Sequence, residues 1–263
     1  MGRISVLIGV YNCAKTLNEA LESLYAQTYP EFKVILCDDG SKDNTYEIAK
    51  RHAESRGNVI LIKNERNMGL NYTLNHCLEY ADTEYIARMD GDDISEPTRF
   101  EKEIQFLDSH PEYDIVSTQM TFFDENGEFR WGKGGGEPRI EDFSKGTPFC
   151  HAPCMVRTKA MKAVGGYSVS DKLLRVEDYH LWIKMYKAGY RGYNLPERLY
   201  KMRDDRNAIA RKTPKNRINE ARVRYLACRE LHLPLKSYIY ILKPLILLLL
   251  PTPIYKYLHS KKL

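Results

Sequence analysis

Three groups of acidic residues stand beside segments that have the patterns of strands or helices. Asp38-Asp39 and Asp90-Gly91-Asp92-Asp93 each follow an apolar run, and Glu177-Asp178 opens a helical pattern. Carboxylates in such places can hold a divalent cation, accept hydrogen bonds from a nucleotide, or remove a proton as a general base. The sequence therefore contains candidates for metal binding and for acid–base catalysis.

The densest of these groups is the Asp90–Asp93 turn. Its three carboxylates repel one another unless a cation lies among them, and Mg²⁺ or Mn²⁺ binds such oxygens together with water and substrate phosphates. A solvated turn is the alternative, because aspartate is also common in turns. Asp38-Asp39 has a similar alternative, since one of these acids can serve only as a helix cap.

Strand and helix patterns alternate through the first half of the chain. The apolar runs expected to be buried parallel strands lie at residues 4–10, 32–37, 59–62 and 85–89. The helices expected between and after them lie at residues 14–27, from a cap at Ser41 or Asn44 to His52, 70–80 and 97–107. This alternation predicts a doubly wound α/β sheet, in which ligands bind beyond the carboxyl ends of the strands.

The pattern changes in the second half. Strands are expected at 113–123 and 128–131, joined by the hairpin turn Asn126-Gly127. The glycine-rich stretch 132–136 is expected to be a mobile loop. Further helices are predicted at residues 178–188 and 217–231.

Charge is distributed unevenly along the 263 residues. The formal net charge is +5, but residues 201–263 carry 15 basic and 4 acidic residues, against 25 basic and 31 acidic residues in 1–200. This division indicates a local anionic partner at one end and argues against nucleic acid bound over the whole surface. A composition of 43% hydrophobic and 29% charged residues excludes a disordered chain or an integral membrane protein.

The cysteines and the N-terminal residues indicate a reduced, cytoplasmic protein. The six cysteines form no zinc-binding pattern, because the spaced pair Cys150 and Cys154 has no second pair. The apolar run near the N-terminus ends at Tyr11, too early for a signal peptide.

The ordered set of segments resembles glycosyltransferase family 2, whose nucleotide-sugar-binding fold is called GT-A. The resemblance covers about residues 3–205. The matching segments lie at 4–12, 23–45, 64–93, 97–107, 151–157 and 165–185. It implies a mostly parallel, Rossmann-like sheet flanked by helices, with a C-terminal helical extension.

The resemblance also implies roles on the donor side. Gly9, Val10 and Tyr11 match the lining of the nucleobase pocket, and Asp39 matches the acceptor of a hydrogen bond from uracil or ribose. Asn67, between Arg66 and Gly69, faces the donor. Asp92 would ligate Mn²⁺ or Mg²⁺ on the diphosphate, and Asp90 would contact the ribose or the same metal.

On the other side of the site, Asp178 matches the catalytic base of the family, and Glu177 and His151 match acceptor-side positions. Glu177 is the alternative acid, and a lone histidine such as His151 is often structural. The chain departs from the family at Ala152-Pro153-Cys154 and at His180. Trp182 is expected in the core, with the border of the acceptor groove as its alternative.

The implied activity is that of an inverting glycosyltransferase, transferring a hexosyl or N-acetylhexosaminyl group from a UDP-sugar to a saccharide hydroxyl. The implied setting is bacterial surface polysaccharide, with an acceptor that is lipid-linked, for example to undecaprenyl diphosphate. A GDP- or dTDP-sugar donor and a non-catalytic nucleotide-sugar-binding protein are the alternatives. A nucleotidyltransferase would have a glycine-rich basic loop where residues 11–14 read Tyr-Asn-Cys-Ala.

The expected domains are a catalytic unit at 1–205, with nucleotide-sugar and acceptor halves at 1–95 and 96–205, and a basic, apolar tail at 206–263. The apolar run 245–250 is too short to span a membrane. Its flanking bases and tyrosines favour a peripheral anchor on the inner face of the cell membrane. The alternative is a helix packed on the catalytic unit or on a second copy.

Overall fold

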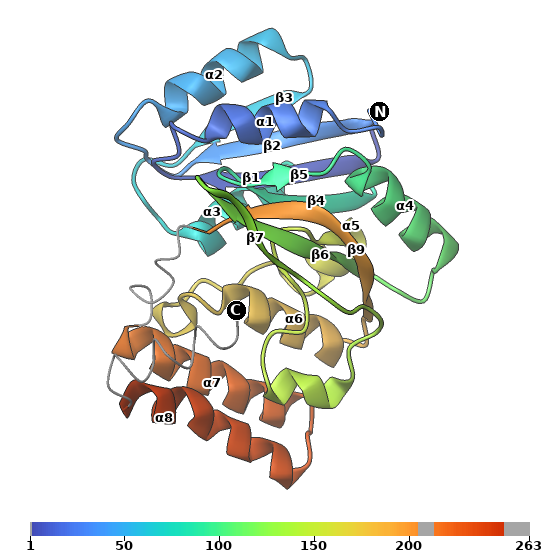
Figure 1. Cartoon of the computed structure of the whole chain (residues 1–263), viewed down its shortest axis with the longest axis vertical. Coiled ribbons are helices and arrows are strands. Elements are labelled where there is room, and N and C mark those ends of the chain that lie inside the picture. The colour runs from blue at the N-terminus through green and yellow to red at the C-terminus, as the bar shows by residue number, and fades with distance from the viewer. Residues whose placement is uncertain (1, 205–212, 250–263) are drawn as a thin grey trace.

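A sheet of nine strands runs through the described part of the chain, which comprises residues 2–204 and 213–249 of the computed structural model (Figure 1). Helices cover both faces of the sheet. Its strands come from both halves of the sequence, so the two expected halves of the catalytic unit share one sheet.

The first half of the chain forms the parallel part of the sheet. Its elements are β1 (Ile4–Val10), α1 (Leu17–Tyr25), β2 (Phe32–Asp38), α2 (Thr45–Ser55), β3 (Val59–Lys63), α3 (Leu70–Glu79) and β4 (Tyr85–Asp90). The strands β3, β2, β1 and β4 lie side by side in that order and are all parallel. The α/β alternation predicted for this half is confirmed.

The second half of the chain extends the sheet with strands that pair in both parallel and antiparallel directions. Its elements are β5 (Ile94–Ser95), α4 (Arg99–Ser109), β6 (Ile115–Asp124), β7 (Gly127–Trp131), β8 (Met155–Arg157), α5 (Thr158–Ala163), α6 (Glu177–Lys187) and β9 (Gly192–Arg203), with short 3-10 turns η1 (Ile140–Ser144) and η2 (Asp171–Leu173). The full order is β3-β2-β1-β4-β8-β6-β9-β5, with β7 paired to β6.

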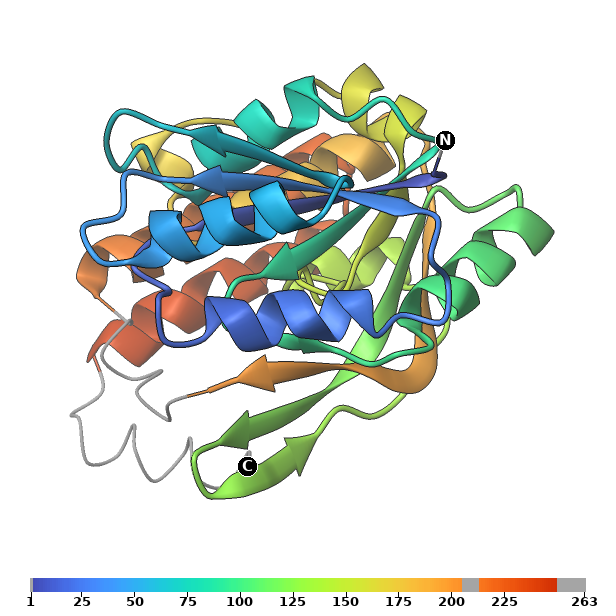
Figure 2. The ribbon, with the colours of Figure 1, turned by 90° about the horizontal axis from the view of Figure 1, so that it is seen from above.

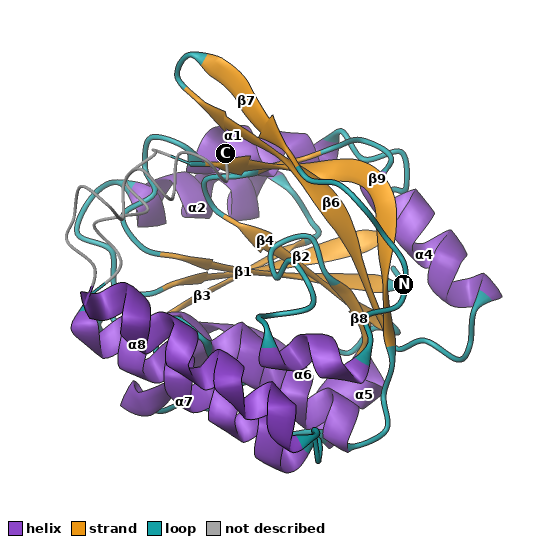
Figure 3. Ribbon diagram, turned by 60° about the horizontal axis from the view of Figure 1, so that its bottom comes forward, coloured by secondary structure: helices purple, strands orange, loops and turns teal. Residues whose placement is uncertain are grey.

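The short strand β8 was not predicted, and it lies antiparallel between β4 and β6. The long strand β9 was not predicted either; it runs parallel to β6 and its register shifts twice. Pro196, Glu197 and Arg198 interrupt its apolar pattern. The outer strands β6, β7 and β9 bend away from the first four (Figures 2 and 3). The sheet is therefore parallel only in part.

Each face of the sheet carries its own hydrophobic cluster. Ile4, Val6 and Ile8 of β1 belong to the cluster covered by α1, α2 and α4, whereas Leu7 belongs to the cluster covered by α3, α5, α6 and α7. Side chains that alternate along a strand point to opposite faces, so a continuous apolar run is needed where both faces are covered. The run at 4–10 satisfies this requirement.

Two helices and a 3-10 turn follow at the C-terminal end: α7 (Pro214–Glu230), η4 (Leu235–Ile241) and α8 (Leu242–Leu249). Helix α7 packs on α6 and η1, and η4 and α8 pack on α7 (Figure 3). The described part of the tail thus packs on the catalytic unit. The expected boundary at 205/206 and the residues from 250 onward lie outside the described residues. Within 2–204 and 213–249, no helix is long and apolar enough to cross a membrane.

The start of α2 and the glycine-rich stretch 132–136 both form hydrogen bonds with neighbouring segments. Asn44 occupies the N-cap position of α2 but its side chain makes no capping bond, and the Ser41 hydroxyl instead accepts a hydrogen bond from the Asn12 N–H at 3.0 Å. In the glycine-rich stretch, the Gly132 N–H donates to the Met120 carbonyl, and Gly136 exchanges two backbone hydrogen bonds with Asn194. Both ends of this stretch are therefore held against the sheet.

A buried ion pair supports the centre of the sheet. Arg99 and Glu103, one turn apart on α4, have no exposed side-chain surface, and the Arg99 Nε donates to the Glu103 carboxylate at 3.2 Å. The Arg99 Nη2 also donates to the carbonyl of Arg88 in β4 at 2.8 Å. Burial raises the pKa of Glu103 to about 7, although the Arg99 charge opposes this rise.

Replacing Arg99 by methionine is expected to destabilise the fold strongly. At pH 8 the Arg99→Met variant leaves a buried carboxylate without its partner, and removing one member of such a pair costs about 3–5 kcal/mol. Urea unfolding followed by circular dichroism measures the loss.

The matched control for this variant is Lys50→Met, which breaks an exposed pair of the same helical spacing with Glu54. It should change the free energy of unfolding by less than about 0.5 kcal/mol. Equal losses of unfolding free energy in the two variants would show that the buried pair stabilises the fold no more than the exposed pair does.

Candidate functional site

The first cavity lies at the carboxyl ends of β1 and β2 and has a volume of about 260 Å³. It contains six of the residues singled out from the sequence: Gly9, Val10, Tyr11, Asp39, Asn67 and Glu177. Its other lining residues are Gly69, Leu70, Asn71, Thr73, Leu174 and Arg175. The chain thus brings together, at one edge of the sheet, residues from four separate segments.

Asp39 holds the wall of the first cavity in place. Its side chain is buried, and its Oδ1 accepts hydrogen bonds from the Asn64 Nδ2 and the Met68 N–H, both at 2.8 Å. Its Oδ2 accepts one from the Gly69 N–H at 2.9 Å. Because a carboxylate has about four acceptor positions, one is left for a ligand. Asp39 is thus a structural acceptor as well as a lining residue.

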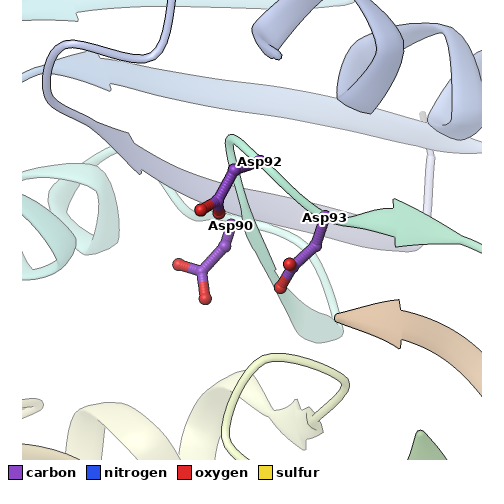
Figure 4. Close-up of side chains that lie close together, drawn as sticks. All are labelled: Asp90, Asp92 and Asp93. Carbon is purple, nitrogen blue, oxygen red and sulfur yellow. The ribbon is translucent and has the colours of Figure 1, made fainter. Parts of the chain in front are cut away.

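The Asp90–Asp93 turn gathers three carboxylates. One oxygen from each of Asp90, Asp92 and Asp93 lies within 4.8 Å of the others, and all three stand on the turn that leaves β4 (Figure 4). Gly91 is required inside this turn, because a Cβ there would lie 2.6 Å from the Cγ1 of Val10. This donor set of hard oxygens fits a divalent cation such as Mg²⁺ or Mn²⁺.

The three carboxylates of the turn have different environments. Desolvation and the neighbouring negative charges raise the pKa of Asp92, and they raise that of the buried Asp93 further. The Asp93 Oδ1 accepts a hydrogen bond from the Arg203 N–H at 2.8 Å. Asp92 is exposed and forms no ion pair with any described residue. Asp92 is therefore the member most open to a cation.

Asp90 is held by a buried arginine that the sequence analysis did not single out. Both guanidinium nitrogens Nη1 and Nη2 of Arg88 donate to the Asp90 carboxylate, the first at 2.7 Å. Arg88 is 5% exposed, and its Nε has no hydrogen-bond partner among the described residues. The available signal was a charged residue inside the otherwise apolar run of β4. Asp90 therefore faces the site in one fixed orientation.

The second cavity lies on the other side of Asp90 and has a volume of about 390 Å³. Asp90, His151 and Asp178 line it, which brings together three residues predicted from distant segments. Arg88 also lines it, as do polar side chains from β6 and β9, Gln119 and Asn194. Glu177 lines the first cavity and Asp178 the second, so the first two residues of α6 stand between the two cavities.

Asp178 has the raised pKa of a general base. Desolvation is the largest cause and the charge of Glu177 the second, and together they raise the pKa of Asp178 from 3.8 to about 6. The Glu177 Oε2 is buried without a hydrogen-bond partner among the described residues. A carboxylate with a pKa near 6 is mostly ionised at neutral pH and binds a proton more readily than an ordinary aspartate.

His151 is a neutral, packed side chain. Its Nε2 forms a hydrogen bond with the Tyr167 hydroxyl at 2.7 Å, and its ring meets that of Trp182 edge to face at 6.0 Å. Desolvation and the Arg88 charge hold the pKa of His151 well below its usual value. Trp182 is 1% exposed, which confirms the core position expected for it.

The comparisons with known proteins agree with the sequence prediction. The profile described as Glycosyl transferase family 2 matches residues 5–165. A Bacillus subtilis (strain 168) protein that is named a glycosyltransferase, EpsE, is 44% identical over 263 residues, covering 99% of this chain and 94% of its own.

A second relative, from Escherichia coli, is named UDP-Glc:alpha-D-GlcNAc-diphosphoundecaprenol beta-1,3-glucosyltransferase WfaP. It is 28% identical over 194 residues, which covers 74% of each chain. Among solved structures, the mannosyltransferase PcManGT of Pyrobaculum calidifontis, in complex with GDP-Man and Mn²⁺, matches with a TM-score of 0.68 at 20% identity. The match covers 99% of this chain and 79% of that one. The GT-A fold expected from the sequence is confirmed by this likeness.

Replacing Asp92 by asparagine is expected to weaken Mn²⁺ binding by about tenfold or more, because a charged oxygen ligand is lost. Titration of free Mn²⁺ by electron paramagnetic resonance measures this directly. The control is Asp82→Asn, which removes an exposed carboxylate that pairs with Lys33 far from the turn. Equal Mn²⁺ affinity in both variants would show that Asp92 is not a ligand of the metal.

Proposed function

The chain belongs to glycosyl transferase family 2, and we propose that it is an inverting enzyme that transfers a hexosyl or N-acetylhexosaminyl group from a UDP-sugar to a saccharide hydroxyl. One observation carries this proposal: the adjacent residues Glu177 and Asp178 line two different cavities, and Asp90 of the acidic turn lines the second of them. One cavity would take the nucleotide and the other the acceptor. Residues 1–95 and 96–205 are the corresponding halves in this proposal.

The nucleotide part of the donor is assigned to the first cavity. The ring of Tyr11 is 39% exposed there and can stack on a base, and Asp39 has an acceptor position left. The N–H groups at the start of α3, next to Asn67, suit a phosphate. Asp92 and Asp90 would hold Mn²⁺ or Mg²⁺, which would neutralise the negative charge that develops on the leaving nucleoside diphosphate.

The acceptor reaction is assigned to Asp178. In the second cavity its carboxylate would remove the proton of an acceptor hydroxyl while that oxygen attacks the anomeric carbon. The attack comes from the face opposite the leaving diphosphate, so the sugar configuration inverts and an α-linked donor gives a β-linked product. His151 would shape the cavity wall as a neutral group.

The proposed acceptor is a saccharide carried on a lipid diphosphate, in cell-surface polysaccharide synthesis. The name of the relative WfaP, which specifies a UDP-sugar and a diphosphoundecaprenol acceptor, supports this choice. GDP remains the competing nucleotide because PcManGT was solved with GDP-Man. Calorimetric titration with UDP, GDP and dTDP in the presence of Mn²⁺ decides between them.

The C-terminal helices support a peripheral place on the inner membrane surface. Exposed apolar side chains repeat at intervals of three and four residues along η4 and α8, and we call them the apolar stripe: Leu235, Ile239, Leu242, Ile246 and Leu249. Lys236 and Lys243 are exposed beside the stripe. An apolar helix face flanked by bases suits the surface of an anionic bilayer.

Transfer is expected to depend on the ionisation of Asp178. Since its pKa is about 6, the rate should rise with pH around that value and fall to about one tenth of its plateau at pH 5. Asp178→Asn should lower transfer by about a hundredfold or more while UDP still binds. UDP release from a panel of UDP-sugars with undecyl-diphosphate N-acetylglucosamine as acceptor measures both.

Two further measurements separate the base from its neighbour. Glu177→Gln removes a charge that raises the Asp178 pKa, so the acidic limb of the variant's pH–rate profile should move to lower pH.

The pKa of Asp178 is about 6 in the folded protein, above the ordinary aspartate value of 3.8. Ionised Asp178 therefore disfavours the folded state above pH 6. Asp178→Asn should therefore raise the free energy of unfolding at pH 8 by on the order of 2 kcal/mol. Substantial transfer by Asp178→Asn would refute the base assignment.

Replacing two residues of the apolar stripe is expected to reduce membrane binding. The double variant Ile239→Ser/Ile246→Ser removes about 0.8 kcal/mol for each inserted methylene and should lower the fraction that sediments with phosphatidylglycerol-rich vesicles severalfold.

The control for the stripe is Val169→Ser/Tyr80→Ser, because these side chains are 58% and 43% exposed outside the stripe. It should sediment like the unmodified protein. Identical vesicle binding by both double variants would assign the stripe to a protein contact instead.

A further inference from the structure

A third cavity of about 430 Å³ lies beyond the two that form the proposed active site. It is rich in arginine, and we call it the arginine cavity. The basic residues that line it are Arg130, Arg175, Arg203 and Arg217. Asp204 and Glu220 are its acidic lining residues, and Phe122, Val176 and Met202 are its apolar ones. The lining therefore carries an excess of positive charge beside an apolar wall.

The arginine cavity borders each of the other two cavities at one shared lining residue. Arg175 lines it and also the first cavity, and Met202 lines it and also the second cavity. Arg175 and Val176 directly precede Glu177-Asp178. A molecule with one end beside Asp178 can therefore extend past Met202 among the arginines.

Two of the arginines have unused hydrogen-bonding capacity. The Arg130 guanidinium stacks on the Phe122 ring at 3.6 Å and contacts Asp204 at 3.4 Å, but its buried Nε has no partner among the described residues. The exposed Arg175 side chain forms no hydrogen bond or ion pair with any described residue. Its backbone φ of +68° is strained for a residue with a side chain.

Guanidinium groups with free donor capacity beside apolar side chains define the chemistry of the ligand. Arginine binds phosphate oxygens through two parallel N–H groups, and a diphosphate offers several such oxygens. The Phe122, Val176 and Met202 side chains suit the first carbons of an alkyl chain. We propose that the arginine cavity binds the diphosphate that joins the acceptor saccharide to its lipid. This inference rests on the proposed function of the second cavity.

The position of the C-terminal helices agrees with this assignment. Asn216, Arg217 and Glu220, in the first turns of α7, line the arginine cavity. Helix α8 packs alongside α7, and its C-terminal end lies at the same end of the molecule as the start of α7 (Figure 1). The apolar stripe thus leads toward the arginine cavity, so a lipid held at the stripe can present its diphosphate there.

The test uses undecyl diphosphate below its micelle concentration, with UDP and an excess of Mg²⁺ present, and measures the dissociation constant of the full-length protein by calorimetry. Undecyl glucoside has the same alkyl chain without the charge and should bind at least about tenfold more weakly. Arg130→Gln and Arg175→Gln should each weaken undecyl diphosphate binding about tenfold, and Arg130→Lys should fall between.

The matched control is Arg56→Gln, which removes a guanidinium that stacks on a tyrosine ring at 4.0 Å outside all three cavities. It should bind undecyl diphosphate like the unmodified protein. Thermal unfolding of each variant shows whether it has kept its fold, and the Arg175→Gln variant provides the result if Arg130→Gln unfolds.

Three outcomes would overturn the proposal. Unchanged binding in both arginine variants would exclude the cavity, and competition between UDP and undecyl diphosphate would make it part of the nucleotide site. Equally tight, arginine-dependent binding of dihexanoyl phosphatidylglycerol would assign it to lipid headgroups. If UDP itself does not bind, the proposed donor is contradicted. If undecyl diphosphate still binds in that case, and its binding still depends on the arginines, the proposal for the arginine cavity is supported.

Discussion

The contact between Arg88 and Asp90 is the interaction on which the arrangement of the site depends. Arg88 lies on β4 at the middle of the sheet, and the Arg99–Glu103 pair beneath it donates to its carbonyl. Its charge fixes Asp90, adds to the effect of burial that lowers the pKa of His151, and lowers the pKa of Asp178 against the effect of burial. A single buried cation therefore contributes to the electrostatics of three groups that line the second cavity.

Topology places the two cavities beside different parts of one sheet. The carboxyl ends of the parallel strands β1, β2 and β4 lie at one edge of the sheet, and the first cavity lies at that edge. The antiparallel strand β8 then allows β6 and β9 to extend the same sheet, and their side chains Gln119 and Asn194 form the wall of the second cavity. One continuous sheet thus supports two neighbouring binding spaces.

The uneven charge of the chain has a structural counterpart. The acidic residues of the body include the turn at 90–93, whereas the basic C-terminal part contributes Arg203 and Arg217 to a separate cavity. The acidic turn and the arginine-rich lining therefore belong to different places in the fold. The apolar stripe on η4 and α8 adds a third type of surface at the same end.

The sequence by itself determined the strands of the first half and the turn of residues 90–93, because a buried parallel strand and a crowded acidic turn are local patterns. The resemblance to a family selected Asp39 and Asp178, and the structure places them in the walls of the first and second cavities. Strands β8 and β9 escaped prediction because pairing with distant strands, rather than a local pattern, stabilises them. Only the tertiary structure decided the partner of Asp90, the raised pKa of Asp178 and the neighbouring positions of three cavities, since burial and Coulomb forces arise from segments that meet only in the fold.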